Sequence, residues 1–109
     1  MCIFCKIISG EIPSEPVYQD EHLLVIKDIA PAAPVHVLIL PKKHIDNISQ
    51  IDAELAAAVF PKIKDIAKLL GLEENGYRLV VNTGKDGGQT VNHLHIHLLG
   101  GRELAWPAG

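Results

Sequence analysis

Histidine and aliphatic residues alternate in one short run near the end of this 109-residue chain, which reads His93-Leu94-His95-Ile96-His97-Leu98-Leu99. A repeat of two residues is the period of a β-strand, in which successive side chains point to opposite faces. The run therefore predicts a strand over residues 93–99, with three imidazoles about 7 Å apart on one face and aliphatic side chains in a core. The alternative is a half-buried strand whose polar face is rich in histidine but carries no chemistry.

The rest of the pattern predicts one α+β domain over residues 1–109, with a mostly antiparallel five-stranded sheet, a short N-terminal helix and one long helix. The short helix is expected over residues 3–9, ending at Gly10, and the long one after the N-cap Asp52, ending at Gly71. Pro61 is expected to kink or split the long helix, because proline lacks a backbone donor. The expected strands are 17–19, 22–27, 35–40, 77–82 and 93–99.

Charge and composition exclude several classes of partner. The net charge is -3 and Lys42-Lys43 is the only adjacent basic pair, which argues against a nucleic-acid partner. No apolar run approaches the length of a membrane span and no cleaved targeting segment is recognisable, so we expect a cytoplasmic protein without a membrane partner. A hydrophobic fraction of 48% in so short a chain favours an oligomer that buries part of its surface.

Two cysteines, Cys2 and Cys5, have the spacing of a zinc knuckle. His44 and His93 are predicted to complete a tetrahedral site, because His44 follows the third expected strand and His93 opens the fifth. A reduced pair of thiols without a metal is the alternative, whereas a thioredoxin-like redox centre is disfavoured because no strand precedes the motif.

The segment between the last two expected strands is too long for a hairpin turn and contains Gly84, Gly87 and Gly88. Glycines let backbone N–H groups turn toward an anion, and Gln89 and Thr90 add side-chain donors beside the histidines. We therefore predict a phosphate cradle, with a flexible connection as the alternative.

Two further residues allow two interpretations each. Asp28 lies at the end of the second expected strand, where its carboxylate either binds the vicinal hydroxyls of a ribose or stabilises an ordinary turn. His36 lies in an otherwise apolar strand, either as a buried histidine held by a backbone carbonyl or as a relay partner of the other imidazoles.

Taken together, these motifs resemble the histidine triad family, in particular its branch of histidine triad nucleotide-binding proteins, the purine nucleoside phosphoramidases. The segments that carry the resemblance are residues 2–8, Gly10-Glu11-Ile12-Pro13, Asp28-Ile29-Ala30-Pro31, residues 34–44, Gly87-Gly88-Gln89-Thr90, the triad, Gly100-Gly101-Arg102 and Trp106-Pro107. Ile26, Thr90 and Asn92 depart from the branch pattern, which more often has an aromatic residue, a serine and a bulky apolar residue there.

The resemblance implies a hydrolase that binds purine nucleotides and cleaves nucleoside 5′-phosphoramidates, such as AMP-lysine or AMP-NH2, without a catalytic cofactor. It implies that His95 is the nucleophile, forming a nucleotidyl-histidine intermediate, while His97 and Thr90 stabilise phosphate charge and His36 orients or relays protons. It also implies structural zinc and a homodimer with a continuous sheet. The implied nucleotide contacts are Asp28 to the ribose, Asn82, Gly88 and Gln89 to the sugar-phosphate, and Ile12, Ile26 and Ile29 to the purine.

Three other functions remain open at this point. A regulatory partner protein would bind purine nucleotides without turnover. A metal-dependent hydrolase would use His93, His95 and His97 as ligands of a catalytic metal. A dinucleotide hydrolase or nucleotidyl transferase of the same family is less favoured, because the Trp106-Pro107 tail resembles that of the phosphoramidases.

Overall fold

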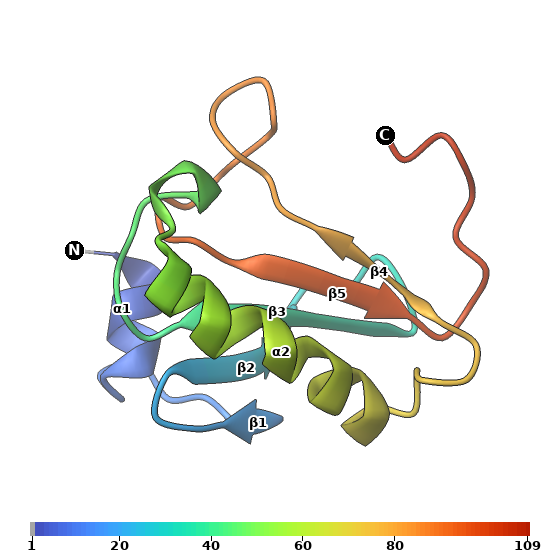
Figure 1. Ribbon diagram of the computed structural model, residues 1–109, viewed down its shortest axis with the longest axis horizontal. Coiled ribbons are helices and arrows are strands. Elements are labelled where there is room, and N and C mark those ends of the chain that lie inside the picture. Colours follow the sequence, from blue (N-terminus) through green and yellow to red (C-terminus); the bar gives the residue numbers. More distant parts are fainter. Residues whose placement is uncertain (1) are drawn as a thin grey trace.

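A five-stranded antiparallel sheet in the order β1-β2-β3-β5-β4 forms the centre of the computed structural model, which describes residues 2–109 (Figure 1). The α+β prediction is thereby confirmed. In chain order the elements are α1 (Ile3–Ile8), β1 (Tyr18–Gln19), β2 (Leu23–Lys27), β3 (Val35–Pro41), the 3-10 helix η1 (Ile48–Gln50), α2 (Ala53–Leu69), β4 (Tyr77–Val80) and β5 (Ile96–Gly100).

Helix α2 crosses one face of the sheet and provides five of the twelve buried residues of the main core (Figure 1). The Asp52 side chain caps the helix by accepting the backbone N–H of Leu55 at 2.8 Å. Apolar side chains at helical spacing then face the sheet, where burial of each contributes about 1.5–3 kcal/mol. They are Leu55, Val59, Ile63 and Ile66, which join a cluster containing Val25, Val37, Ile39, Ile96 and Leu98 of the strands.

Pro61 does not split α2, which runs unbroken from Ala53 to Leu69, so that part of the prediction is wrong. The proline deprives the carbonyl of Ala57 of its helical partner. Pro61 and Ala57 are both exposed, so water can hydrate that carbonyl and the helix continues.

The opposite face of the sheet is divided between a small core and a polar surface. Helix α1 covers one end with Phe4, which belongs to a second apolar cluster with Leu24, Ile26, Leu38 and Leu40. The remainder carries His36 of β3 and His97 of β5, because these positions alternate with the residues that face α2. The register places Leu38 opposite His97 and Leu99 opposite His36, so the two histidines are diagonal neighbours.

The histidine run enters the sheet later than its alternation predicts, because β5 begins at Ile96 and not at residue 93. The N–H of Leu94 donates to the carbonyl oxygen of Ile45 at 2.8 Å, which ties the preceding segment to a loop instead of to a strand. His93 and His95 therefore lie just outside the ladder. The other expected strands differ from β1 to β4 by one or two residues at their ends, the largest difference being that β4 stops at Val80.

The two edges of the sheet differ. β1 has only two residues, whereas β4 has four residues and is paired on one side alone, with β5.

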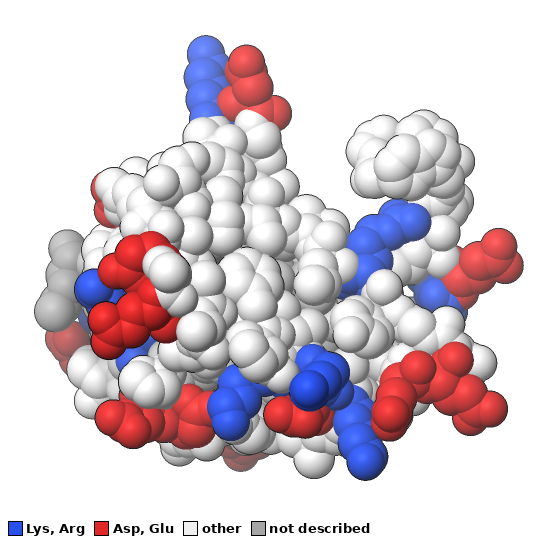
Figure 2. Space-filling view, viewed as in Figure 1, with Lys and Arg blue, Asp and Glu red and all other residues white. Residues whose placement is uncertain are grey.

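Acidic and basic side chains are interspersed on the face that carries α2, with a broad uncharged area between them (Figure 2). None of the helices within residues 2–109 combines the length and the apolar character needed to cross a membrane.

Candidate active site and metal cluster

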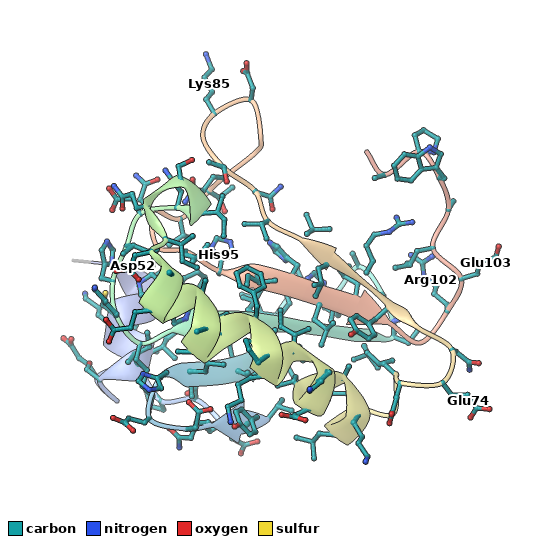
Figure 3. The ribbon with its side chains drawn as sticks, in the orientation of Figure 1. Asp52, Glu74, Lys85, His95, Arg102 and Glu103 are labelled. Carbon is teal, nitrogen blue, oxygen red and sulfur yellow. The ribbon has the colours of Figure 1, made fainter. Side chains whose placement is uncertain are left out.

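His95 lies just before β5, with its ring held in one orientation (Figure 3). Its Nδ1 lies 2.8 Å from the backbone carbonyl oxygen of His93, in a buried contact. A carbonyl oxygen only accepts, so Nδ1 must carry the proton, and the neutral ring then keeps its lone pair on Nε2. The ring also packs at 71° against Phe4, with centroids 5.0 Å apart. His95 is thus a buried imidazole whose free lone pair is defined by the backbone.

A second pair of imidazoles, His36 and His97, is ordered by the same kind of contact. The backbone N–H of Ala32 donates to Nδ1 of His36 at 3.0 Å, which leaves the proton of that ring on Nε2. Nε2 of His36 lies 2.9 Å from Nδ1 of His97 and donates to it. The neutral ring of His97 therefore carries its proton on Nε2. His97 is thus a donor beside His95, and the centroids of the two rings are 5.2 Å apart.

Asp28 adjoins this relay. Its Oδ2 lies 3.3 Å from Nε2 of His36 and 4.0 Å from Nδ1 of His97, and its Oδ1 accepts the N–H of Ala30 at 2.8 Å. Burial lowers the pKa of His97 from its ordinary value, the neighbouring His95 and His36 lower it further, and Asp28 acts in the opposite direction. His97 consequently favours the neutral state that the relay requires.

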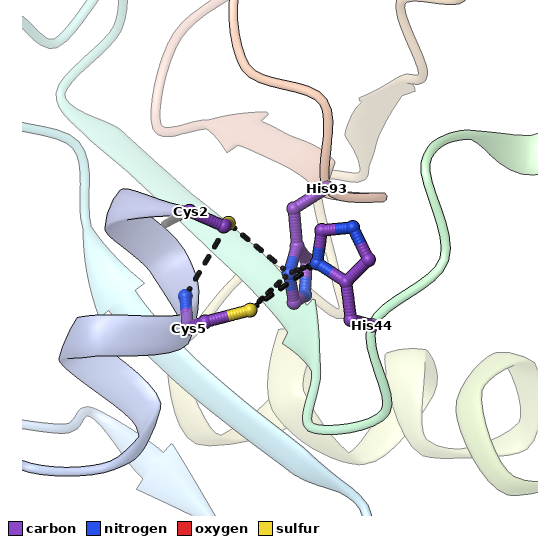
Figure 4. A group of neighbouring side chains, drawn as sticks. All are labelled: Cys2, Cys5, His44 and His93. Carbon is purple, nitrogen blue, oxygen red and sulfur yellow. Dashed lines mark hydrogen bonds between the residues drawn. The ribbon is translucent and has the colours of Figure 1, made fainter.

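Four potential metal ligands converge near the N-terminus of α1: the N-cap Cys2, Cys5 within the helix, His44 and His93 (Figure 4). Nδ1 of His93 lies 3.5 Å from both sulfur atoms and 3.0 Å from Nδ1 of His44, which is 3.2 Å from the sulfur of Cys5. Ligand atoms around tetrahedral zinc lie about 3.3–3.8 Å apart, given bonds of about 2.0–2.3 Å. The predicted ligand set is therefore brought together close to the spacing of a metal site, with the two distances to His44 slightly shorter.

The hydrogen bonds around this cluster fit a cation. Nε2 of His93 donates to the carbonyl oxygen of Pro41 at 2.8 Å, and Nε2 of His44 donates to the Asp46 carboxylate at 3.1 Å. Both rings therefore turn lone pairs on Nδ1 toward one another, an arrangement that a positive ion between them stabilises. Burial lowers the pKa of His93, which keeps its ring a neutral ligand, and desolvation together with Cys2 raises the pKa of Cys5, a shift that a bound cation would oppose.

Two other histidine groupings are less suited to a metal. Asp28, His36 and His97 also lie close together, but Nδ1 of His36 accepts the N–H of Ala32, so its Nε2 carries a proton where a metal would need a lone pair. His93, His95 and His97, the ligands of the alternative metal hydrolase, do not form a metal-binding group within residues 2–109. The ring of His93 faces the cysteines, and His95 donates to a carbonyl instead.

Hydrogen bonds from side chains at its two ends hold the glycine-rich segment in shape. The side chain of Gln89 donates to the carbonyl oxygens of Asp46 and Val91 at 2.6 and 3.0 Å and accepts the N–H of Gly84 at 3.0 Å. Asn82 donates to the carbonyl oxygen of Gly87 at 2.7 Å. Both side chains hold the loop in shape, while Gly88 and Thr90 are exposed and form no hydrogen bond with the histidines in the described chain. The loop rises to an exposed tip at Lys85 (Figure 3).

The three isoleucines expected at the purine occupy different environments. Ile26 is 9% exposed on β2, beside Phe4 in the small core, and Ile12 is half-buried after α1. Ile29 is fully exposed, at 102%, in the turn that follows Asp28. The structure thus places Asp28 next to the histidine relay, with Ile29 free at the surface beside it.

Several groups at the site were not anticipated from the sequence. The backbone groups of Ala32, Pro41 and His93 set the tautomers of the rings, and backbone groups carry no residue-type signal. Phe4 and Asp46 did carry a signal. Phe4 is the aromatic residue between the two cysteines, and Asp46 follows His44 by two positions.

Fold and site together define an α+β protein in which a buried histidine with a free lone pair lies beside a histidine relay. The HIT domain model matches residues 9–104. An uncharacterized HIT-like protein of Synechococcus elongatus is 54% identical over 98% of this chain and 96% of its own length. The chain belongs to the HIT, or histidine triad, family.

Solved structures of the family agree with this assignment. A HIT family hydrolase from Legionella pneumophila superimposes with a TM-score of 0.95 at 49% identity and covers 100% of both chains. A histidine triad nucleotide-binding protein from Candida albicans gives a TM-score of 0.85 at 37% identity, covering 100% of this chain and 85% of its own. The chain is therefore similar to hydrolases and to nucleotide-binding proteins of the same fold.

Proposed function

We propose that this HIT family protein is a phosphoramidase, which binds purine nucleotides and cleaves nucleoside 5′-phosphoramidates of the AMP-lysine or AMP-NH2 type. The observation that supports it best is the pairing of opposite tautomers. His95 keeps its lone pair on Nε2, and the adjacent His97 keeps a proton there. A nucleophile and a donor side by side suit attack on a phosphorus atom whose oxygens gain charge.

The proposed reaction has two displacements. Nε2 of His95 attacks the α-phosphorus, the phosphorus–nitrogen bond to the leaving amine breaks, and that nitrogen takes up one proton. Water then attacks the nucleotidyl-histidine, gives up one proton and releases AMP, which restores the neutral ring. Nδ1 of His95 keeps its proton throughout and donates it to the carbonyl oxygen of His93, so the positive charge of the intermediate lies next to a fixed acceptor.

His36, His97, Asp28 and the loop complete the proposed site. His36 orients His97 through a bond of 2.9 Å, and His97 donates to the phosphate together with Thr90 and the N–H groups near Gly88. Asp28 binds the ribose hydroxyls, and Ile12, Ile26 and Ile29 contact the purine. Gln89 and Asn82 act by holding the loop, since their amides already bond to its backbone.

Incubation with adenosine 5′-phosphoramidate and chromatographic detection of AMP tests the proposal. We expect AMP from the wild-type protein and a covalent adduct on His95 after rapid acid quench. Tight AMP binding without AMP release would instead favour the regulatory partner protein. Faster cleavage of a dinucleoside polyphosphate than of the phosphoramidate would favour the dinucleotide hydrolase.

We further propose that Cys2, Cys5, His44 and His93 hold a structural zinc ion and that the protein is a cytoplasmic homodimer. The mixed sulfur and imidazole ligand set suits zinc, and a reducing compartment keeps both free thiols available. Tyr77 and Leu79 of β4 lie on the α2 side of the sheet, yet each remains 40% exposed. A second copy paired along β4 would cover them and extend the sheet.

A further inference from the structure

His93 belongs to two sites at once. Its ring takes part in the cluster of Cys2, Cys5 and His44, while its backbone oxygen accepts the Nδ1 proton of His95 at 2.8 Å. The residue is fully buried, and its Nε2 is held by the carbonyl of Pro41 at 2.8 Å. Because close packing leaves this buried ring little room to turn independently, a displacement of the ring would shift the carbonyl that sets the tautomer of His95.

Phe4 provides a second connection between the same two sites. It lies in α1 between the two cysteines and is 8% exposed. Its ring contacts His95 with centroids 5.0 Å apart and His93 with centroids 6.0 Å apart, both edge to face. The helix that supplies two metal ligands thus also supplies the wall against which the His95 ring is packed.

Helix α1 depends on its attachments, because six residues form too short a helix to be stable alone. Phe4 fixes it to the sheet by apolar packing, and the two cysteines face His44 and His93 across a distance that a metal would bridge. If the cysteines are not bridged to the histidines, α1 and His93 lose a shared anchor, and both supports of the His95 ring loosen.

We propose that the Cys2–Cys5–His44–His93 cluster positions the nucleophile: metal binding fixes the His93 carbonyl and the Phe4 ring, and these hold His95 in the tautomer with a free Nε2 lone pair. The identity of His95 as nucleophile rests on the function proposed above. His93 and Phe4 are then positioning residues, which touch His95 and not the substrate. Loss of the metal lets His95 populate the other tautomer, in which Nε2 carries the proton and cannot attack.

The test compares zinc-loaded wild-type protein with His44→Ala, which removes an outer ligand that contacts neither His95 nor Phe4. The ring nitrogens are observed by 15N NMR at a fixed pH of about 8, where unperturbed histidines are neutral. In the wild type we expect His95 to show a protonated Nδ1 and a bare Nε2. In His44→Ala we expect zinc to be lost, measured by elemental analysis, and both His95 signals to move toward tautomer-averaged positions.

Kinetics provide the second readout. Loss of a group that orients a reactive side chain typically lowers activity by about 10–100-fold, so we expect kcat of His44→Ala to fall about tenfold. KM should change less than kcat, because the proposed ribose contact Asp28 and the exposed Ile29 lie outside the cluster. His22→Ala is the matched control, since His22 is exposed and outside both clusters, and it should keep the zinc, the His95 signals and kcat.

Unchanged His95 signals in zinc-free, folded His44→Ala would overturn the proposal, as would wild-type protein that takes up no zinc. If His44→Ala does not fold, zinc-loaded Phe4→Leu replaces it, and unchanged His95 signals there would count equally against the proposal. A tautomer shift in a protein that releases no AMP from the phosphoramidate would refute the proposed activity while supporting the positioning role. The two proposals therefore fail separately.

Discussion

At the scale of single residues, backbone groups decide what each imidazole can do. His95 and His36 are chemically identical side chains, yet one meets a carbonyl oxygen at Nδ1 and the other an N–H group. The first keeps its lone pair on Nε2 and the second keeps a proton there. Alternation in the sequence brought the histidines to one side of the chain, but it could not predict these roles, because Ala32 and His93 act through groups that every such residue has.

Replacement of the proposed nucleophile tests the role of His95 directly. We expect His95→Asn to abolish AMP release while AMP binding, measured by calorimetry, stays within about tenfold, because the change removes the covalent path and few ground-state contacts. His22→Asn, at an exposed position, is the control and should retain full activity. AMP release by His95→Asn at a rate near that of the wild type would rule out the nucleotidyl-histidine mechanism.

The lowered pKa of His97 predicts the pH dependence of the rate. Protonation of His97 fills Nδ1, which then cannot accept from His36. We therefore expect kcat/KM to rise with pH through an apparent pKa below the ordinary histidine value of about 6.5 and then to level. Stopped assays across this range measure it. A rate that falls as the pH rises from 5 to about 7 would contradict a neutral His97.

The lowered pKa of His97 also makes the free energy of unfolding depend on pH. Because its pKa is lower in the folded chain than in the unfolded chain, the unfolded state binds more protons between the two values. This contribution to the free energy of unfolding is complete above about pH 6.5 and decreases as the pH falls below it. Urea denaturation at several pH values should show the decrease, and His97→Gln should weaken it.

At the scale of elements, the sequence predicted the existence and order of all five strands and both helices, because apolar periodicity reports which face is buried. The start of β5 could not be predicted in this way. His93 and Leu94 continue the alternation of the strand, but His93 turns to the cysteines and Leu94 bonds to Ile45, and both partners lie far away in the chain. Exposure of Pro61 likewise depends on which side of α2 meets the sheet.

The glycine loop is an element whose shape leaves no room for a side chain at Gly87. A Cβ built there would lie 2.3 Å from the carbonyl oxygen of Thr83, which is backbone and cannot move aside freely. We expect Gly87→Ala to lower the free energy of unfolding by about 1–3 kcal/mol and to reduce kcat/KM, since the loop must rearrange. Lys85→Ala at the exposed tip should change the unfolding free energy by less than about 0.5 kcal/mol. Equal denaturation midpoints for the two variants would show that the loop tolerates the extra atom.

At the scale of the whole molecule, the sheet separates packing from chemistry. The face under α2 is filled with aliphatic side chains, while the other face holds the histidine relay and the end covered by α1. Successive side chains of β3 and β5 point to opposite faces, so this division could be predicted from the sequence. For the attachment of α1 to the sheet, the sequence predicted only the ligand set, Cys2 and Cys5 with His44 and His93.

Removal of both thiols tests whether the cluster attaches α1 to the sheet. We expect Cys2→Ser combined with Cys5→Ser to lose zinc and to lower Tm, because the binding free energy of a structural metal is also folding free energy. Elemental analysis and thermal denaturation measure the two effects. Ser9→Ala, at an exposed position after α1, is a control that should keep the zinc. An unchanged Tm in the zinc-free double variant would show that the cluster does not stabilise the fold.

The open edge at β4 predicts the effect of one charge on assembly. Leu79 is 40% exposed on the α2 side, and burial of a lysine there against a second copy would be unfavourable. We expect light scattering to show a dimer for the wild type and a monomer for Leu79→Lys at micromolar concentration. Ile3→Lys, at a residue 50% exposed on α1, should remain dimeric. A monomeric wild type would show that no dimer forms. A dimeric Leu79→Lys would show that the interface lies away from β4.

The inequality of the two sheet edges also limits how far such an assembly can grow. Two copies joined at β4 by a twofold axis present β1 at both outer ends. β1 offers two residues for pairing and follows Pro16, which has no N–H to donate. A sheet that pairs through β4 would therefore be closed to a third chain, and pairing would end at two chains without the risk of a fibre.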